Sequence, residues 1–289
     1  MISTDYIIAG HRVRVEGLRL SFAVQKMRGF DLFLSQHGET PICKFLSSDS
    51  TDIPEFLSET TLLYADSKDG YSSEFLEKTD GGFIFKSSSE RGDKLVFETN
   101  RNAKETIFYG DYAEDILRFA LWLAYGLATL HTLTVSLHSS SILYKDKVVL
   151  FLGESGTGKS THSRLWLENI KGAELFNDDS PILRVENGEI RVYGGPWSGK
   201  TPCYRKEHYP LAGCVRLSQA PYNKIFRLSK LEAYAALHPS CPPEFAYDEK
   251  LYDYVSEFLG AVVSKTPVYR MEALPDAAAA ELSCKTLFG

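Results

Sequence analysis

The sequence contains no long apolar run. Its 289 residues include no uninterrupted stretch of about 18 apolar residues, which is the length that a membrane-spanning helix needs. The longest apolar segment, residues 119–130, is interrupted by Gly126 and Thr129, so we expect a buried helix there and no membrane partner. The first residues also lack the basic start and the apolar core of a signal peptide. We therefore expect a cytoplasmic protein.

Cysteine motifs and basic clusters are missing as well. The five cysteines stand far apart without CxxC spacing, and an odd number of scattered thiols fits a reducing compartment better than a disulfide framework. The formal net charge is −6 and no block of lysine or arginine occurs, which argues against nucleic acid as the main partner. The histidines form no HxH or HExxH pair that would predict a zinc site.

A phosphate-binding pattern stands in the middle of the chain. Five apolar residues, 148–152, precede the run GESGTGKST, which fits G-x-x-x-x-G-K-[ST]. Glycines let successive backbone N–H groups converge on phosphate oxygens, and the helix that follows adds the positive end of its dipole. An ordinary glycine-rich turn is the alternative. We expect a nucleoside triphosphate to be bound by Gly153, Glu154, Ser155, Gly156, Thr157, Gly158, Lys159, Ser160 and Thr161.

Two aspartates follow the next expected strand. Asn177, Asp178 and Asp179 come directly after the half-apolar run 173–176, and Asp178 stands 19 positions after Lys159. A right-handed crossover would make this strand a parallel neighbour of the loop strand, with both carboxyl ends on one rim. There the Ser160 hydroxyl and a carboxylate could hold magnesium, and a second carboxylate could accept a proton from an attacking hydroxyl. A solvated Asp-Asp turn is the alternative.

The stretch from 137 to 182 resembles the catalytic domain of HPr kinase/phosphorylase and its relatives, which share a phosphate-loop architecture with phosphoenolpyruvate carboxykinase. The likeness rests on His138, 15 positions before Gly153, on the small residues inside the loop, and on a double aspartate soon after the loop lysine. The resemblance implies a kinase that uses ATP and Mg²⁺ and transfers the γ-phosphoryl group to a hydroxyl, such as a serine of a protein or peptide.

The same resemblance implies roles for individual residues. Lys159 would contact the β- and γ-phosphates, and Ser160 would bind magnesium. Asp178 would act as the base toward a serine hydroxyl, Asp179 would lie near the metal, and His138 would assist the phosphate site. Taken alone, a histidine at the start of a strand is as often a structural residue. HPr kinases assemble as oligomers, which leaves a homo-oligomer open for this chain.

The chain departs from the family downstream of the aspartates. Glu189-Ile190-Arg191 stands only 11 positions after Asp178, within an expected hairpin over 182–193, so we do not take it for the acidic motif of the bifunctional enzymes. A glycine- and proline-rich loop, 194–202, follows instead. Its Lys200, and Arg205 just beyond it, are candidates for contacts to phosphate or acceptor, although the segment could equally be a surface turn. A carboxykinase-like enzyme acting on a small acid and a non-catalytic ATP-binding switch or scaffold remain alternatives.

The chain divides into two regions of different character. Short β-type runs occupy 6–8, 12–15, 18–22, 82–86 and 94–98. From about Asp111 apolar residues recur at helical intervals instead. We expect a smaller β-rich accessory domain over 1–107 and a P-loop nucleotide-binding, kinase-like domain over 108–289, in an α/β fold. Near the end of the chain we expect strands at 213–217 and 267–271, the latter at a sheet edge, and helices at 228–237, 251–263 and 275–288.

Overall fold

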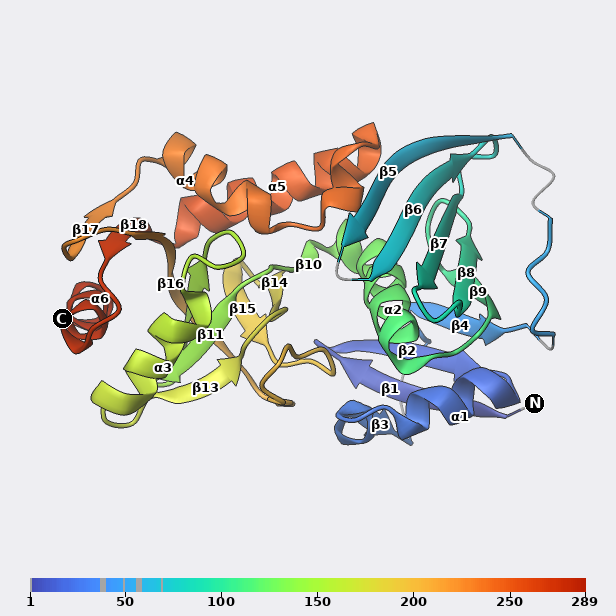
Figure 1. Ribbon diagram of the computed structural model, residues 1–289, viewed down its shortest axis with the longest axis horizontal. Coiled ribbons are helices and arrows are strands. Elements are labelled where there is room, and N and C mark those ends of the chain that lie inside the picture. The colour runs from blue at the N-terminus through green and yellow to red at the C-terminus, as the bar shows by residue number, and fades with distance from the viewer. Residues whose placement is uncertain (1, 37–39, 49, 56–58, 69) are drawn as a thin grey trace. The chain divides into compact units, whose positions relative to one another are not determined.

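Two compact units make up the chain (Figure 1). The computed structural model describes residues 2–36, 40–48, 50–55, 59–68 and 70–289. Unit 1 comprises residues 1–131 and 243–251, and unit 2 comprises residues 132–242 and 252–289. Each unit contains a nine-stranded sheet together with helices, which confirms the mixed α/β class. Among the described residues, no helix is long and apolar enough to cross a membrane.

The sheet of unit 1 has the order β3-β1-β2-β4-β9-β8-β7-β6-β5. Its strands are β1 (Ser3–Ile8), β2 (His11–Glu16), β3 (Leu34–Ser35), β4 (Cys43–Ser47), β5 (Thr60–Lys68), β6 (Tyr71–Lys78), β7 (Phe83–Ser89), β8 (Lys94–Thr99) and β9 (Glu105–Gly110). The same unit holds the helices α1 (Leu18–Lys26) and α2 (Glu114–Thr129) and the 3₁₀ turns η1 (Phe30–Phe33) and η4 (Pro243–Ala246).

Helix α1 replaces the strand that alternation predicts at 18–22. The alternating apolar residues Leu18 and Phe22 are 65% and 58% exposed, so they do not form a buried strand face. Burial instead follows Leu20 and Val24, which are four positions apart and therefore lie on one face of a helix. The prediction of a strand was wrong because residues 18–22 are compatible with both the alternation of a strand and the spacing of a helix. The burial of Leu20 together with Val24 selects the helix.

Helix α2 extends unit 1 to residue 131. Ten of its residues are buried, and it packs on β7 and β8. The unit therefore reaches beyond residue 107, where the change in sequence character places the domain boundary. The difference arises because a helix that follows a sheet in the sequence can bury its apolar stripe against that same sheet.

Unit 2 contains a sheet whose main path runs β10-β14-β15-β16-β12-β11-β13, with β18 beside β16 and β17 beside β18. Its strands are β10 (Thr134–Ser136), β11 (Ser140–Tyr144), β12 (Lys147–Leu152), β13 (Glu174–Asn177), β14 (Ile182–Glu186), β15 (Glu189–Tyr193), β16 (His208–Gln219), β17 (Lys224–Arg227) and β18 (Val268–Ala273). Its helices are α3 (Lys159–Asn169), α4 (Lys230–Leu237) and α6 (Ala277–Phe288), together with most of α5 (Glu249–Lys265).

The centre of this sheet is parallel. Strand β16 pairs in parallel with β12 on one side and with β18 on the other. The proline before β18 predicts an edge strand. This prediction was wrong, because β17 folds back along β18 in antiparallel register. The hairpin over 182–193 and the last helix agree with the sequence analysis.

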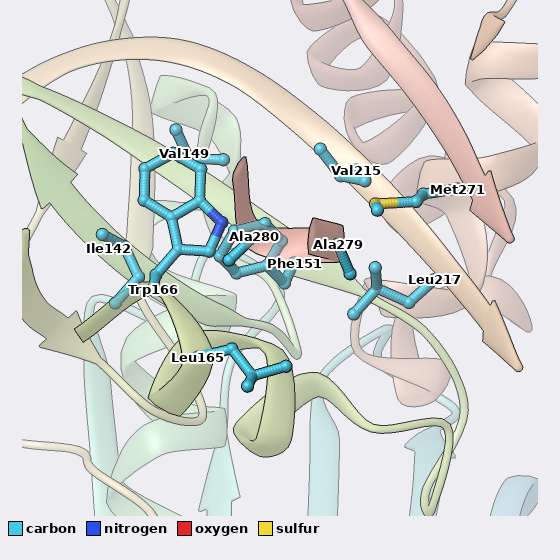
Figure 2. Close-up of a cluster of buried hydrophobic side chains, with 10 residues drawn as sticks. All are labelled: Ile142, Val149, Phe151, Leu165, Trp166, Val215, Leu217, Met271, Ala279 and Ala280. Atoms are coloured by element: carbon cyan, nitrogen blue, oxygen red, sulfur yellow. The ribbon is translucent and has the colours of Figure 1, made fainter. Parts of the chain in front are cut away.

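Helices α3 and α6 close the core beside these parallel strands. Figure 2 shows the buried cluster, formed by Ile142, Val149, Phe151, Leu165, Trp166, Val215, Leu217, Met271, Ala279 and Ala280. The hydroxyl of Ser283 in α6 lies 2.9 Å from Trp166 Nε1 and 3.0 Å from His162 Nε2. These polar contacts satisfy the two buried rings, and they fix the start of α3 relative to α6.

Candidate functional site

The predicted phosphate loop is a tight turn between β12 and α3. Gly156 and Gly158 have φ angles of 81° and 102°, which favour glycine. The backbone N–H and the hydroxyl of Thr157 both donate to the carbonyl of Glu154, at 3.2 and 2.8 Å. A Cβ at Gly153 would stand 2.4 Å from Thr157 Oγ1, so a side chain at this position would open the turn.

Lys159 is the first residue of α3, and its ammonium group turns back into the loop. Nζ donates to the carbonyl oxygens of Gly153 at 2.8 Å and Glu154 at 3.3 Å. The next residue, Ser160, is exposed. Because the first amides of a helix have no intrahelical partner, they point along the axis toward the loop and favour an anion there. The loop thus combines the amides of a helix start with a cation.

Two residues of β16 brace this loop, and the sequence analysis missed both. Arg216 Nη2 pairs with Glu154 Oε1 at 2.6 Å, while its Nη1 donates to the carbonyl of Ala236. Gln219 Nε2 donates to the carbonyl of Gly156 at 3.1 Å. The contacts arise because β16 runs parallel to β12, with Arg216 level with Leu152 at the strand end. The strand itself was predicted, but its pairing partner was not.

The double aspartate lies at the carboxyl end of β13. This strand is parallel to β12 in the same sheet, as predicted, but the two are not neighbours, because β11 lies between them and is antiparallel to both. Asn177, the last residue of β13, is fully buried and shapes the turn that follows. Its Oδ1 accepts the N–H groups of Asp179 and Ser180, and its Nδ2 donates to the carbonyl of Trp197.

Asp178 holds the glycine-rich loop. Its Oδ1 accepts the Ser198 hydroxyl at 2.9 Å and the Gly199 N–H at 2.7 Å, and its Oδ2 accepts the Thr201 N–H at 2.7 Å. A Cβ at Gly199 would lie 3.0 Å from Asp179 Cβ. The close approach explains why a glycine stands there. Lys200 lies between Gly199 and Thr201 in the chain and is exposed.

Asp179 faces His138 and the phosphate loop. Its Oδ1 lies 3.3 Å from His138 Nδ1, and its Oδ2 accepts the Ser180 hydroxyl at 2.7 Å. Burial tends to raise the pKa of Asp179. The hydrogen bonds from His138 and Ser180 and the positive charge of Lys159 outweigh burial, so the pKa lies below its usual value of 3.8. His138 is fixed in turn by its N–H, which donates to the carbonyl of Ser240 at 2.7 Å.

Arg205 is placed differently from the other predicted residues. Its Nη2 pairs with Glu174 Oε2 at 2.8 Å, and its guanidinium lies over the ring of Phe176. Glu174 begins β13 whereas Asp178 follows the end of this strand, so the guanidinium is bound at the opposite end from the aspartates. The structure therefore brings together the loop, Lys159, Asp179 and His138, with Asp178 and Lys200 beside them, and leaves Arg205 apart.

A cavity of about 500 Å³ adjoins the loop. Its walls come from the loop, the start of α3, and the residues that end β16 and β18. Gly156, Gly158 and Gln219 line it near the loop, and Leu217 and Leu274 are among its apolar walls. A flat apolar ring could lie there while a phosphate chain reaches the glycines.

The donors at the site fit magnesium bound together with a phosphate ligand. No group of three or more His, Cys, Asp or Glu side chains that could hold a metal occurs in the part of the chain that the structure describes. Magnesium needs fewer protein ligands than that, because it keeps several waters and binds one or two carboxylates plus substrate phosphates. The Asp179 carboxylate, with 41% of its side chain exposed, and the exposed Ser160 hydroxyl offer such a set.

Comparison with known proteins gives little further detail. No family model matches the chain, and no curated protein matches it. Among solved structures, the HPr(Ser) kinase/phosphatase from Coxiella burnetii is similar over 53% of this chain and 92% of its own, with 15% identity and a TM-score of 0.29.

Proposed function

We propose that this protein is an ATP- and magnesium-dependent phosphotransferase that resembles HPr kinase and moves the γ-phosphoryl group to a hydroxyl, such as that of a serine in a protein or peptide. The observation that carries the proposal is the meeting of two separate segments at one rim of a sheet. The cationic loop after β12 and the aspartates after β13 lie close enough for the charge of Lys159 to act on Asp179.

The phosphate chain is the natural ligand of the loop. Backbone N–H groups between Gly153 and Ser160 would surround the β- and γ-phosphates, with Lys159 leaving the Gly153 carbonyl to bind phosphate oxygens. The nucleoside would occupy the neighbouring cavity. Ser160 and Asp179 would hold magnesium, which supplies charge neutralisation on the phosphates when bound.

Asp178 would serve as the base. In this structure the Ser198 hydroxyl donates to Oδ1 of Asp178, which is the hydrogen bond that an acceptor hydroxyl would make to a base. An acceptor would replace Ser198, give its proton to Asp178 and form the new bond to the γ-phosphorus, while the bond to the bridging oxygen breaks and ADP leaves. Lys200 would stabilise charge at the acceptor side.

Equilibrium binding tests the first half of this proposal. We expect Mg·ATP to bind, and Lys159→Ala to weaken binding roughly 10- to 100-fold, the range expected for losing a charged hydrogen bond to phosphate. Lys171→Ala is the matched control, because it removes the same charge from an exposed position after α3. Equal binding by both variants and the wild type would exclude the loop as the phosphate site.

A non-catalytic nucleotide switch is the second candidate, and one observation favours it. Asp178 accepts three hydrogen bonds from the loop 198–201, so its carboxylate stabilises this loop and, while it does so, is not free to act as a base. A switch would bind ATP without transferring phosphate. The carboxykinase-like alternative has less support, since Arg205 and Arg216 are each paired with a carboxylate of the protein itself.

A further inference from the structure

Strand β5 is an open edge of the sheet in unit 1. It pairs with β6 on one side, and no described residue forms a ladder along its other side. It has nine residues, whereas β3 at the opposite edge has two. Seven of the nine are exposed, and Leu62 is 56% exposed. A long exposed edge presents unpaired backbone donors and acceptors to another strand.

The neighbouring hydrogen bonds show which β5 residues direct their backbone groups outward. In an antiparallel ladder, both groups of one residue point to the same side, and successive residues alternate. The backbone N–H of Lys78 donates to the carbonyl of Gly82, which is on the β7 side. The backbone N–H of Thr79 donates to the carbonyl of Glu59, which is on the β5 side. Odd-numbered residues of β6 therefore face β5, and the β5 residues opposite them face inward. By the register of the pair, the outward-facing residues are Thr60, Leu62, Ala65 and Ser67.

A bulge makes this outward row symmetric. The register shifts between Leu62 and Tyr64, so Leu62 and Ala65 are three positions apart, while the outward residues on either side are two apart. The spacing is the same read from either end. Two antiparallel copies of β5 can therefore align Thr60 with Ser67 and Leu62 with Ala65, each pair occurring twice. Any other register leaves some of the four residues without an outward-facing partner.

The side chains at the ends of β5 are complementary in the same alignment. Glu59 of one copy lies opposite Lys68 of the other, again twice, and both residues are exposed. Opposite charges placed directly across two strands stabilise the pair. The contact uses the same strand of both copies, so it closes on itself and leaves no β5 edge free for a third chain.

We propose that the protein forms a two-fold dimer in which β5 of unit 1 pairs with β5 of a second copy. The inference rests on backbone register and charge and is independent of the proposed phosphotransfer. Pairing joins two nine-stranded sheets into one and buries an edge that would otherwise invite uncontrolled strand addition.

Sedimentation equilibrium of the full chain with Leu62→Pro tests the pairing. The Leu62 N–H faces outward, so proline removes an inter-copy donor without removing a β5–β6 hydrogen bond. The change removes two donors per dimer, and we expect the dimer to weaken roughly 10- to 100-fold. Leu62→Thr keeps the N–H and serves as the control, for which we expect less than about a three-fold change. Circular dichroism checks that both variants are folded.

A charge exchange tests the register without altering the backbone. Glu59→Lys and Lys68→Glu each place like charges opposite one another twice, and we expect each to weaken the dimer roughly ten-fold. The double variant restores opposite charges and should return to near wild-type association. A wild-type chain that stays monomeric at all soluble concentrations would overturn the proposal and leave the β5 edge to a strand of another protein. A dimer that ignores all of these changes would also overturn it.

Discussion

Replacing Glu244 by glutamine should stabilise unit 1 at alkaline pH. Glu244 in η4 is only 3% exposed, and its Oε2 has no hydrogen-bond partner among the described residues. Burial, reinforced by the negative charge of Asp66, raises the pKa of Glu244 to about 7 from its usual 4.5. At pH 8 the folded protein therefore holds a buried, incompletely paired carboxylate, which glutamine replaces with a neutral group of similar size.

The magnitude follows from proton linkage. Because the folded pKa exceeds the unfolded one, the folded state binds more protons between pH 4.5 and 7, and stability falls as pH rises through this window. A difference of about 2.5 pKa units corresponds to about 3 kcal/mol at pH 8. We expect Glu244→Gln to recover about 2 kcal/mol, since its buried amide also loses contact with water. Near pH 5 the gain should shrink to under about 1 kcal/mol.

Urea unfolding at pH 5 and pH 8, followed through unit 1, measures this difference. Hydrogen exchange of the β5 and β6 amides follows this unit directly. Glu90→Gln, an exposed position in the same unit, controls for the change in net charge. A Glu244→Gln protein that is no more stable than the wild type at pH 8, or whose gain is equal at both pH values, would refute the reasoning.

Three further predictions concern unit 2. Burial lowers the pKa of His162 to about 4 from 6.5. The neutral ring therefore favours folding above pH 6.5, and this stability is lost as the pH falls toward 4. Urea titrations should show that His162→Gln loses less stability than the wild type between pH 7 and pH 5. Gly153→Ala places a Cβ 2.4 Å from Thr157 Oγ1, and we expect the distorted loop to bind Mg·ATP at least about ten-fold more weakly by calorimetry, a strain of 1–3 kcal/mol being typical of such a clash; unchanged affinity would contradict the geometry. Asp178→Asn replaces one oxygen that accepts a loop N–H by an amide donor. We expect faster hydrogen exchange at Gly199 or Thr201 and a loss of about 1–2 kcal/mol in the free energy of unfolding. Unaltered exchange would show that the carboxylate does not hold the loop.

Local features of the sequence predicted the centre of the site. The loop follows the end of β12, and α3 begins at Lys159, as predicted. These positions were predictable because the apolar run, the glycines and the helix start are contiguous in the chain. The strand before Asp178 was also placed within one residue of its observed bounds. In both cases the determining interactions lie within a few residues of one another.

Features that depend on distant segments were not predictable in the same way. The contacts from Arg216 and Gln219 to the loop require knowing that β16 pairs with β12. The insertion of β11 between β12 and β13 depends on an antiparallel hairpin that a simple crossover does not include. The hydrogen bonds from the loop 198–201 to Asp178 likewise join residues 20 to 23 positions apart. Pairing between strands is set by the shared core, and a single sequence does not display it.

Transfer of labelled phosphate is the most direct test of the proposed function. The purified protein would be incubated with γ-labelled ATP, magnesium and a lysate of the source cell, beside Lys159→Ala, Asp178→Asn and the exposed control Lys171→Ala. We expect a labelled acceptor with the wild type and with Lys171→Ala, and none with the other two variants. Magnesium-dependent ATP binding without any labelled acceptor would contradict the phosphotransferase and favour the switch.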